Sequence, residues 1–138
     1  MTSEAPSLDH LPKGHRFDPA PFRLEDEWVE AYLAAVEDET TPTLGGGVVP
    51  PLATVALAVR ALLYQARLPA GAVHLGQELR CHRLLCRGEE LVAEMSISSH
   101  TVRQGWHFIQ VGMVIKDSQG EEVLTGEALI ISPQREEA

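Results

Sequence analysis

Residues 50–66 read PPLATVALAVRALLYQA, and this stretch decides the fold. Alanine and leucine dominate it, and both favour a helix, while Pro51 suits the first helical position, where a missing N–H costs nothing. Residues 52–63 contain only two polar side chains, Thr54 and Arg60. A helix that is apolar nearly all round is buried on most of its sides or lies in a membrane, and a membrane span needs about 20 such residues. The sequence therefore predicts a soluble domain built around one buried helix.

Length and composition fit one domain and exclude several function classes. The chain has 138 residues, enough for one core. Its formal net charge of -9 disfavours a nucleic-acid partner. The two cysteines, Cys81 and Cys86, lack C-x-x-C spacing, so no metal site is expected. Residues 1–11 contain neither the basic nor the apolar part of a signal peptide, and we expect a cytoplasmic protein that does not bind membranes.

Several segments precede the central helix. Residues 1–12 are polar and are predicted to form a disordered lead-in. Residues 13–23 contain two internal prolines, which are unsuited to a central strand, so we expect an edge strand or an extended arm. An amphipathic helix with acidic residues in its first turn is predicted from Leu24 to Glu37. Acids, threonines and three glycines then predict a loop that runs to Gly47 and leads directly into the central helix.

Four segments of alternating apolar and polar residues follow the helix, at 73–85, 91–102, 106–116 and 121–132. Short turn sequences separate them, which predicts a four-stranded antiparallel meander. A sheet of this kind curled around one helix is an α+β architecture. The predicted class is therefore α+β, with a long central helix wrapped by a curved antiparallel sheet.

The last predicted strand gives expectations for both faces of the sheet. Gly126 and Ala128 share one face, where their small size would let the helix approach closely. On the other face, Val123, Leu129 and Ile131 would remain uncovered by a single helix. We therefore expect self-association to cover them.

Three segments carry a family resemblance: residues 28–38 (WVEAYLAAVED), residues 48–54 (VVPPLAT) and residues 74–91. They resemble the first helix, the start of the central helix and the strand-and-turn signature of the MaoC-like acyl dehydratase and (R)-specific enoyl-CoA hydratase family. The resemblance implies a single hotdog domain over residues 13–132, and residues 133–138 are predicted to form a charged tail. It also implies homodimers or heterodimers of hotdog subunits that bind an acyl group on CoA or acyl carrier protein. No cluster of residues indicates a metal or redox cofactor.

The loop before the central helix departs from the family's catalytic pattern. The resemblance implies an Asp, then Asn-Pro, then a His five residues after the Asp. Aligned on the loop proline, Glu39 and Thr41 take the Asp and Asn positions and Leu44 takes the His position. Aligned instead on Asp38, the His position is taken by Thr43. Neither leucine nor threonine can carry a proton, so the catalytic candidates in this loop are Asp38, Glu39 and Thr41.

Hydration of an enoyl thioester needs a base, an acid and a donor that holds the thioester oxygen as it gains charge. The start of the central helix offers free N–H groups to such an oxygen. Because two prolines precede them and lack an N–H, Leu52 or Ala53 would be the donor. Gly46 and Gly47 would then lie against the substrate, or the glycines would serve only to make a tight loop.

The acid–base pair has two interpretations. Asp38 or Glu39 could act as the base if burial raised its pKa, or the acidic loop could simply be solvated. By strand alternation His74 shares a face with His82, and either could face the site of a dimer partner or be an ordinary strand histidine. Two functions therefore remain open: a hydro-lyase of unusual site composition, or a non-catalytic subunit that pairs with a catalytic one.

Overall fold

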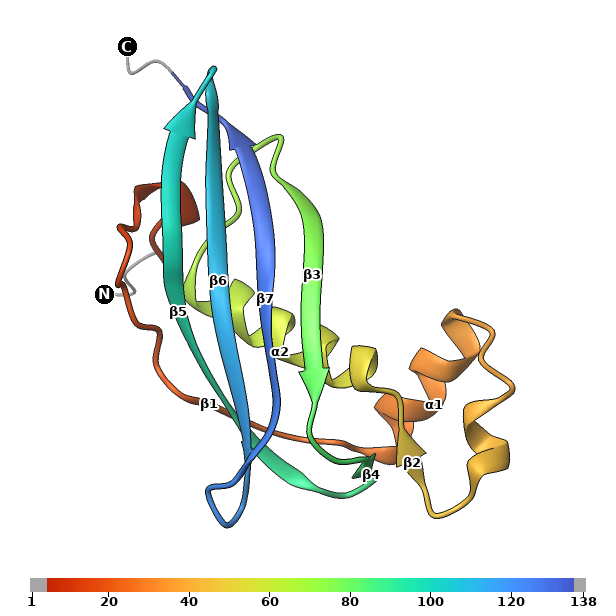
Figure 1. Cartoon of the computed structure of the whole chain (residues 1–138). Helices are drawn as coiled ribbons and strands as arrows, with labels where there is room; N and C mark the ends of the chain where they lie inside the picture. Colours follow the sequence, from red (N-terminus) through yellow and green to blue (C-terminus); the bar gives the residue numbers. More distant parts are fainter. Residues whose placement is uncertain (1–4, 136–138) are drawn as a thin grey trace.

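The computed structural model describes residues 5–135 and packs one long helix, α2 (Pro51–Gln65), against one face of a five-stranded antiparallel sheet (Figure 1). The strands, in their order across the sheet, are β1 (Ala20–Arg23), β5 (Glu90–Arg103), β6 (Trp106–Asp117), β7 (Glu122–Pro133) and β3 (Val73–Cys81). The predicted α+β class is confirmed.

Helix α2 begins at Pro51, as predicted, and ends where Ala66 turns to an extended conformation. Its buried side faces the sheet and consists of Ala53, Thr54, Val55, Ala58 and Leu62. The opposite side is not covered within one chain, because the sheet curls around only one side of the helix: Leu52 is 53% exposed and Tyr64 is 74% exposed. The expectation that most sides are buried was therefore too broad. Within residues 5–135, neither helix combines the length and hydropathy that crossing a bilayer requires.

Helix α1 (Asp26–Ala35) lies beside the start of α2. Its first turn contains acidic residues, which favour a helix start, and it buries Val29 and Leu33. After it, Glu37 has a φ of 55°, a left-handed conformation that ends the helix. The loop then forms a short 3-10 helix, η2 (Thr41–Leu44), and strand β2 (Val48–Val49), which pairs with β4 (Leu85–Cys86) in a small second sheet.

The predicted meander is correct for β5, β6 and β7 but wrong for β3. Strand β3 pairs with β7, with Gln77 opposite Ala128, and so forms the edge of the sheet farthest from β1. The link between β3 and β5 contains β4 and carries the chain across the end of the sheet (Figure 1). Sequence periodicity identifies strands but does not identify their partners, which is why this pairing was missed.

On β5 and β6 the apolar side of the predicted alternation is the inner face of the sheet. The alternating residues Leu91, Ala93, Met95, Ile97, Ile109, Val111, Met113 and Ile115 are all buried. Val123 was misassigned, because the β6–β7 pairing shifts register between Ile115 and Lys116 and leaves Val123 only 1% exposed. Gly126 does permit a close approach, although by a strand: a Cβ there would lie 2.4 Å from the carbonyl oxygen of Glu78 on β3.

The predicted lead-in is ordered over its described part. Residues 8–10 form a 3-10 helix, η1 (Leu8–His10), and the Leu8 N–H donates to the Arg67 carbonyl at the end of α2. Leu8 is 0% exposed, because this segment covers apolar surface that would otherwise face water. The start of the lead-in, residues 1–4, and the last part of the predicted tail, residues 136–138, lie outside the described residues.

Candidate functional site

An open groove lies where α1, the loop after it and the start of α2 meet strand β3. Its volume is about 700 Å³. The lining side chains are apolar except for a group of acids and one threonine: Tyr32, Val36, Glu37, Asp38, Glu39, Thr40, Pro50, Pro51, Leu52 and Leu79. Another hollow of about 740 Å³ lies across β3 and β7 but contains none of the predicted site residues. The first groove is therefore the candidate site.

The start of α2 leaves one backbone donor free at the groove. The Ala53 N–H donates to the Pro50 carbonyl at 3.0 Å, so it is not available to a ligand. Pro50 and Pro51 have no N–H. In the part of the chain that the structure describes, the Leu52 N–H has no acceptor, as is usual in the first turn of a helix. Of the two predicted donors, the geometry favours Leu52.

The glycines before α2 have a conformational role. Gly45, Gly46 and Gly47 have φ values of 73°, 69° and 70°, a left-handed conformation that other residues adopt with strain. The predicted ligand contacts Gly46 and Gly47 are not among the residues that line the groove. Instead the Gly47 carbonyl accepts the Arg87 N–H at 2.9 Å, which anchors the loop.

The carboxylate of Asp38 is used to hold the loop. Its Oδ1 accepts the backbone N–H groups of Thr40 at 3.0 Å and Thr41 at 2.9 Å, and its Oδ2 accepts the Thr41 hydroxyl at 2.6 Å. The hydroxyl of Thr41, followed by these backbone groups, lowers the pKa of Asp38 below its ordinary value of 3.8. The condition for a base at Asp38, a pKa raised by burial, is not met, because hydrogen bonds to the ionised form outweigh desolvation. Asp38 is therefore a weak base, and the Thr41 hydroxyl already donates to it.

Glu39 also lines the groove, but the loop does not hold its carboxylate. Its side chain is exposed and, among the described residues, makes no hydrogen bond or ion pair. The two residues at the alternative His positions offer no proton carrier, since Leu44 is exposed and apolar and the Thr43 hydroxyl donates to the Thr40 carbonyl at 2.6 Å. Of the loop candidates, only Glu39 retains a free carboxylate.

His74 lies far from the groove. It is near the beginning of β3, whereas the groove is lined by Leu79, five residues further on and thus about 15 Å away along the strand. A register shift between His74 and Gly76 also reverses the alternation, so His74 lies opposite inward-facing Ile130. His82 lies beside Thr125 on the other face. The two histidines therefore do not share a face, and no histidine of residues 5–135 lines the groove.

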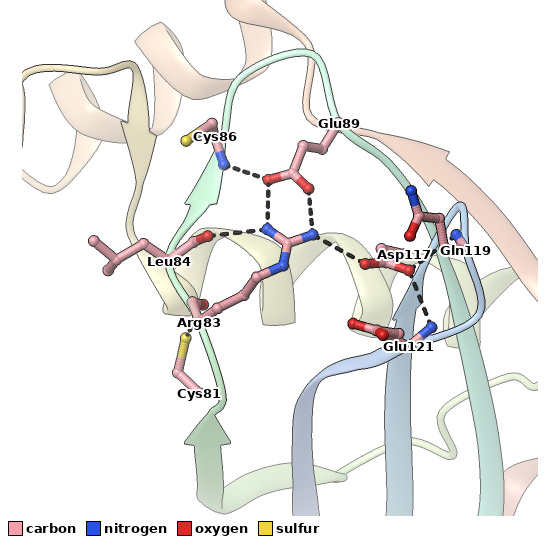
Figure 2. A network of polar contacts seen from close by, with 8 residues as sticks. All are labelled: Cys81, Arg83, Leu84, Cys86, Glu89, Asp117, Gln119 and Glu121. Atoms are coloured by element: carbon pink, nitrogen blue, oxygen red, sulfur yellow. Dashed lines mark hydrogen bonds and ion pairs between the residues drawn. The ribbon is translucent and has the colours of Figure 1, made fainter.

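Sequence reasoning missed a polar network between the β3–β4 link and the β6–β7 turn (Figure 2). Arg83 donates to Glu89 through both terminal nitrogens, at 3.1 and 2.7 Å, and to Asp117 at 3.2 Å. Glu89 also accepts the Cys86 N–H at 2.7 Å. The guanidinium lowers the pKa of Glu89, and the Glu121 N–H is the main cause of a lowered pKa at Asp117. The network therefore joins the β3–β4 link, the β4–β5 turn and the β6–β7 turn, and it contacts β4 through the Cys86 N–H.

Comparisons with known proteins identify the family and the fold. A family model described as "FAS1-like, dehydratase domain region" matches residues 12–126. No curated protein matches the chain. A MaoC-like dehydratase from Rhodospirillum rubrum is similar over 95% of this chain and 99% of its own, with 22% identity and a TM-score of 0.71. The (R)-hydratase PhaJ1 from Pseudomonas aeruginosa has 20% identity and a TM-score of 0.68, over 93% of this chain and 88% of its own.

A third solved structure is a complex of two kinds of chain. The truncated 3R-hydroxyacyl-ACP dehydratase complex HadBC from Mycobacterium tuberculosis has 21% identity and a TM-score of 0.71, over 91% of this chain and all of the matched one. Likeness at these identities concerns the fold. It confirms the predicted single hotdog fold, in which a curved antiparallel sheet packs around one long helix.

Proposed function

The chain belongs to the FAS1-like dehydratase-region family of MaoC-like hotdog proteins, and we propose that it is the substrate-binding subunit of an enoyl-thioester hydratase or 3-hydroxyacyl dehydratase. In this proposal the acyl group of an acyl-CoA or acyl carrier protein thioester occupies the groove at the start of α2. A second hotdog subunit supplies the acid–base pair. No metal or redox cofactor takes part, and the protein works in the cytoplasm.

The observation that carries this proposal is the chemistry of the groove. It contains an apolar wall and a free backbone donor, which suit binding, and it contains no histidine among the described residues. Asp38 is held ionised by the loop. Because hydration requires a base near neutral pKa and an acid to protonate the α-carbon, this groove is better equipped to hold a thioester than to convert it.

The proposed thioester contact is the Leu52 N–H. The first turn of α2 carries the positive end of the helix dipole, which favours an oxygen that gains negative charge. Pro50 and Pro51 provide no N–H, and the Ala53 N–H is occupied. A single oriented donor would therefore position the thioester carbonyl, with the acyl chain against Tyr32 and Leu79.

The proposed subunit interface is the β3 edge of the sheet. Strand β3 is an edge strand, whose unpaired backbone groups can accept a neighbouring strand. On it Val73 and Leu75 are exposed. A second hotdog chain added at β3 would bury these two side chains. The heteromeric HadBC and ChsH1-ChsH2 complexes among the structural neighbours support pairing of unlike chains.

The test compares the purified chain alone with the chain co-expressed with a catalytic hotdog hydratase from the same genome. We expect the chain alone to bind saturated acyl-CoA, measured by calorimetry, but not to hydrate enoyl-CoA, measured by loss of the enoyl absorbance. The co-expressed pair should copurify and turn over. Turnover by the chain alone, or failure to bind any acyl-CoA, would contradict the proposal.

One observation favours a second candidate function, a self-sufficient hydro-lyase. Glu39 lines the groove with an unengaged carboxylate and could serve as a base. In that case the chain alone would hydrate enoyl-CoA and Glu39→Gln would abolish turnover. Glu37→Gln is the matched control, because Glu37 also lines the groove with an exposed carboxylate.

A further inference from the structure

His100 and His107, near the turn that joins β5 and β6, form a chain of hydrogen bonds with the N-terminal segment (residues 5–18). His100 Nδ1 lies 2.6 Å from the Leu11 carbonyl oxygen, and His100 Nε2 lies 2.9 Å from His107 Nδ1. Because a carbonyl oxygen only accepts, His100 Nδ1 must carry a hydrogen. A second hydrogen lies between His100 Nε2 and His107 Nδ1, and either nitrogen can carry it.

The geometry of the two rings is that of a hydrogen bond. Their centroids are 5.1 Å apart while the facing nitrogens of His100 and His107 are 2.9 Å apart, so each facing nitrogen lies close to the line between the ring centres. Two rings binding one metal ion would instead direct both lone pairs to a third point. One proton between the rings satisfies both nitrogens.

This arrangement limits the number of protons that the pair can hold. When both rings are neutral, the His107 Nδ1–H donates to His100 Nε2. When His100 is a cation, its Nε2–H donates to a neutral His107, and the Leu11 bond is kept. When both rings are cations, two N–H groups face one another and the bond between the rings is lost.

The surrounding elements offer little to stabilise the doubly charged state. On the N-terminal segment the ionisable residues that flank Leu11 are Asp9, described below, and the basic residues His10, Lys13, His15 and Arg16. On β5 the next is Arg103, whose guanidinium lies over the Phe108 ring of β6. The β7 positions reached by the strand register, Ile130 and Ser132, do not ionise.

The acids of the N-terminal segment are placed elsewhere. Asp9 accepts the Ser7 hydroxyl and faces His10. Asp18 lies at the other end of the segment, where its backbone exchanges two hydrogen bonds with the Gln65 side chain. Neither carboxylate is bonded to the histidine pair.

The Leu11 bond lies between the other attachments of the segment. The Leu8 N–H donates to the Arg67 carbonyl, and the N–H groups of Gly14 and Phe17 donate to carbonyls on β5. Leu8, Leu11 and Phe17 are buried, so detachment of this segment would expose part of the core.

We propose that His100 and His107 form a proton-operated clip, which holds the N-terminal segment on the sheet while the pair carries at most one proton. When both rings are protonated, repulsion between the two cations moves His100 away from the Leu11 carbonyl and releases the segment. Histidine is the side chain that ordinarily changes charge between about pH 5 and pH 8. The proposal is independent of the thioester function.

The test is amide hydrogen exchange of the full chain at about pH 7.5 and about pH 5.5, corrected for intrinsic exchange rates. If release is coupled to one proton, the opening constant of the Gly14 and Phe17 amides should rise by up to about tenfold per pH unit as the pH falls. Amides in the β6–β7 pairing, away from the segment, should change little. Unchanged protection of Gly14 and Phe17 would overturn the proposal.

Two variants separate the clip from general acid destabilisation. An asparagine amide can replace the Nδ1–H donor of a histidine, so His100→Asn keeps the Leu11 bond without a titrating ring. His107→Asn leaves His100 as the one titrating ring, so the pair can no longer carry two cations. Both variants should keep the segment protected at both pH values, whereas His100→Ala should expose it at both. Acid-dependent release that persists in both asparagine variants would refute the clip.

Discussion

Asp38 and Thr41 are joined by two hydrogen bonds that close the loop before the central helix: Asp38 Oδ1 accepts the Thr41 N–H at 2.9 Å, and Oδ2 accepts the Thr41 hydroxyl at 2.6 Å. These bonds favour the ionised carboxylate. The pair therefore stabilises the loop at the place where an acid–base pair was expected.

The first prediction concerns titration of Asp38. Thr41→Val removes the largest cause of its lowered pKa, so the pKa should rise toward the ordinary value of 3.8, as measured by carboxyl NMR. Stability that Asp38 contributes is present above that ordinary value and is lost as the pH falls through the lower folded pKa. Thr43→Val is the control, because the Thr43 hydroxyl bonds to a carbonyl and not to Asp38. An equal shift in both variants would contradict this assignment.

The second prediction tests the thioester donor and rests on the proposed function. Leu52→Pro removes the N–H at a position in the first helical turn that tolerates proline, and it also removes the leucine side chain. Leu52→Ala removes the side chain but keeps the N–H. Loss of one hydrogen bond costs about 1–2 kcal/mol, so acyl-CoA affinity should be roughly tenfold weaker in the proline variant than in the alanine variant. Equal affinities by calorimetry would exclude this donor.

A third prediction concerns the contact between β3 and β7. A Cβ on Gly126 would lie 2.4 Å from the Glu78 carbonyl oxygen, so Gly126→Ala forces the strands apart. We expect destabilisation by about 1–3 kcal/mol in urea unfolding. Gly112→Ala on β6 is the control, since its Cβ would meet its nearest neighbour at 3.8 Å. If both glycines tolerate alanine equally, the close approach does not constrain the fold.

The fourth prediction tests the Arg83 network. Glu89→Gln weakens a two-point ion pair and a bond to the Cys86 N–H, and should cost about 1–2 kcal/mol of unfolding free energy. The matched variant Glu90→Gln breaks only the exposed pair with Arg23 and should cost about 0.5 kcal/mol or less. Because the pKa of Glu89 is lowered from 4.5, the difference between the variants should shrink as the pH falls below that value.

The fifth prediction concerns subunit pairing. Leu75 is 56% exposed on edge strand β3, and a lysine there would place an unpaired charge in the proposed interface. We expect Leu75→Lys to separate the chain from its co-expressed hotdog partner, so that light scattering after gel filtration finds single subunits in place of the pair. Leu84→Lys, at an equally exposed leucine outside β3 and α2, should leave the pair intact. Dissociation by both substitutions, or by neither, would place the interface elsewhere.

Part of the candidate site was within reach of local reasoning. An Asp followed closely by Thr40 and Thr41 is a pattern in which the carboxylate bonds to nearby backbone N–H groups, and recognising it would have corrected the base assignment for Asp38. The Arg83 network was not accessible in this way. Arg83 and Asp117 are 34 positions apart, and nothing in either neighbourhood indicates the other.

The sequence by itself determined the helix start at Pro51, the strands and the inward-facing residues of β5 and β6, because helical and strand periodicities depend on neighbouring positions along the chain. Tertiary structure alone decided that β3 pairs with β7, that His74 faces away from His82, and that Leu79 completes the groove. These outcomes depend on strand register and on bulges. Register is set by contacts between segments far apart in the sequence, and a shift of one residue exchanges the two faces of a strand.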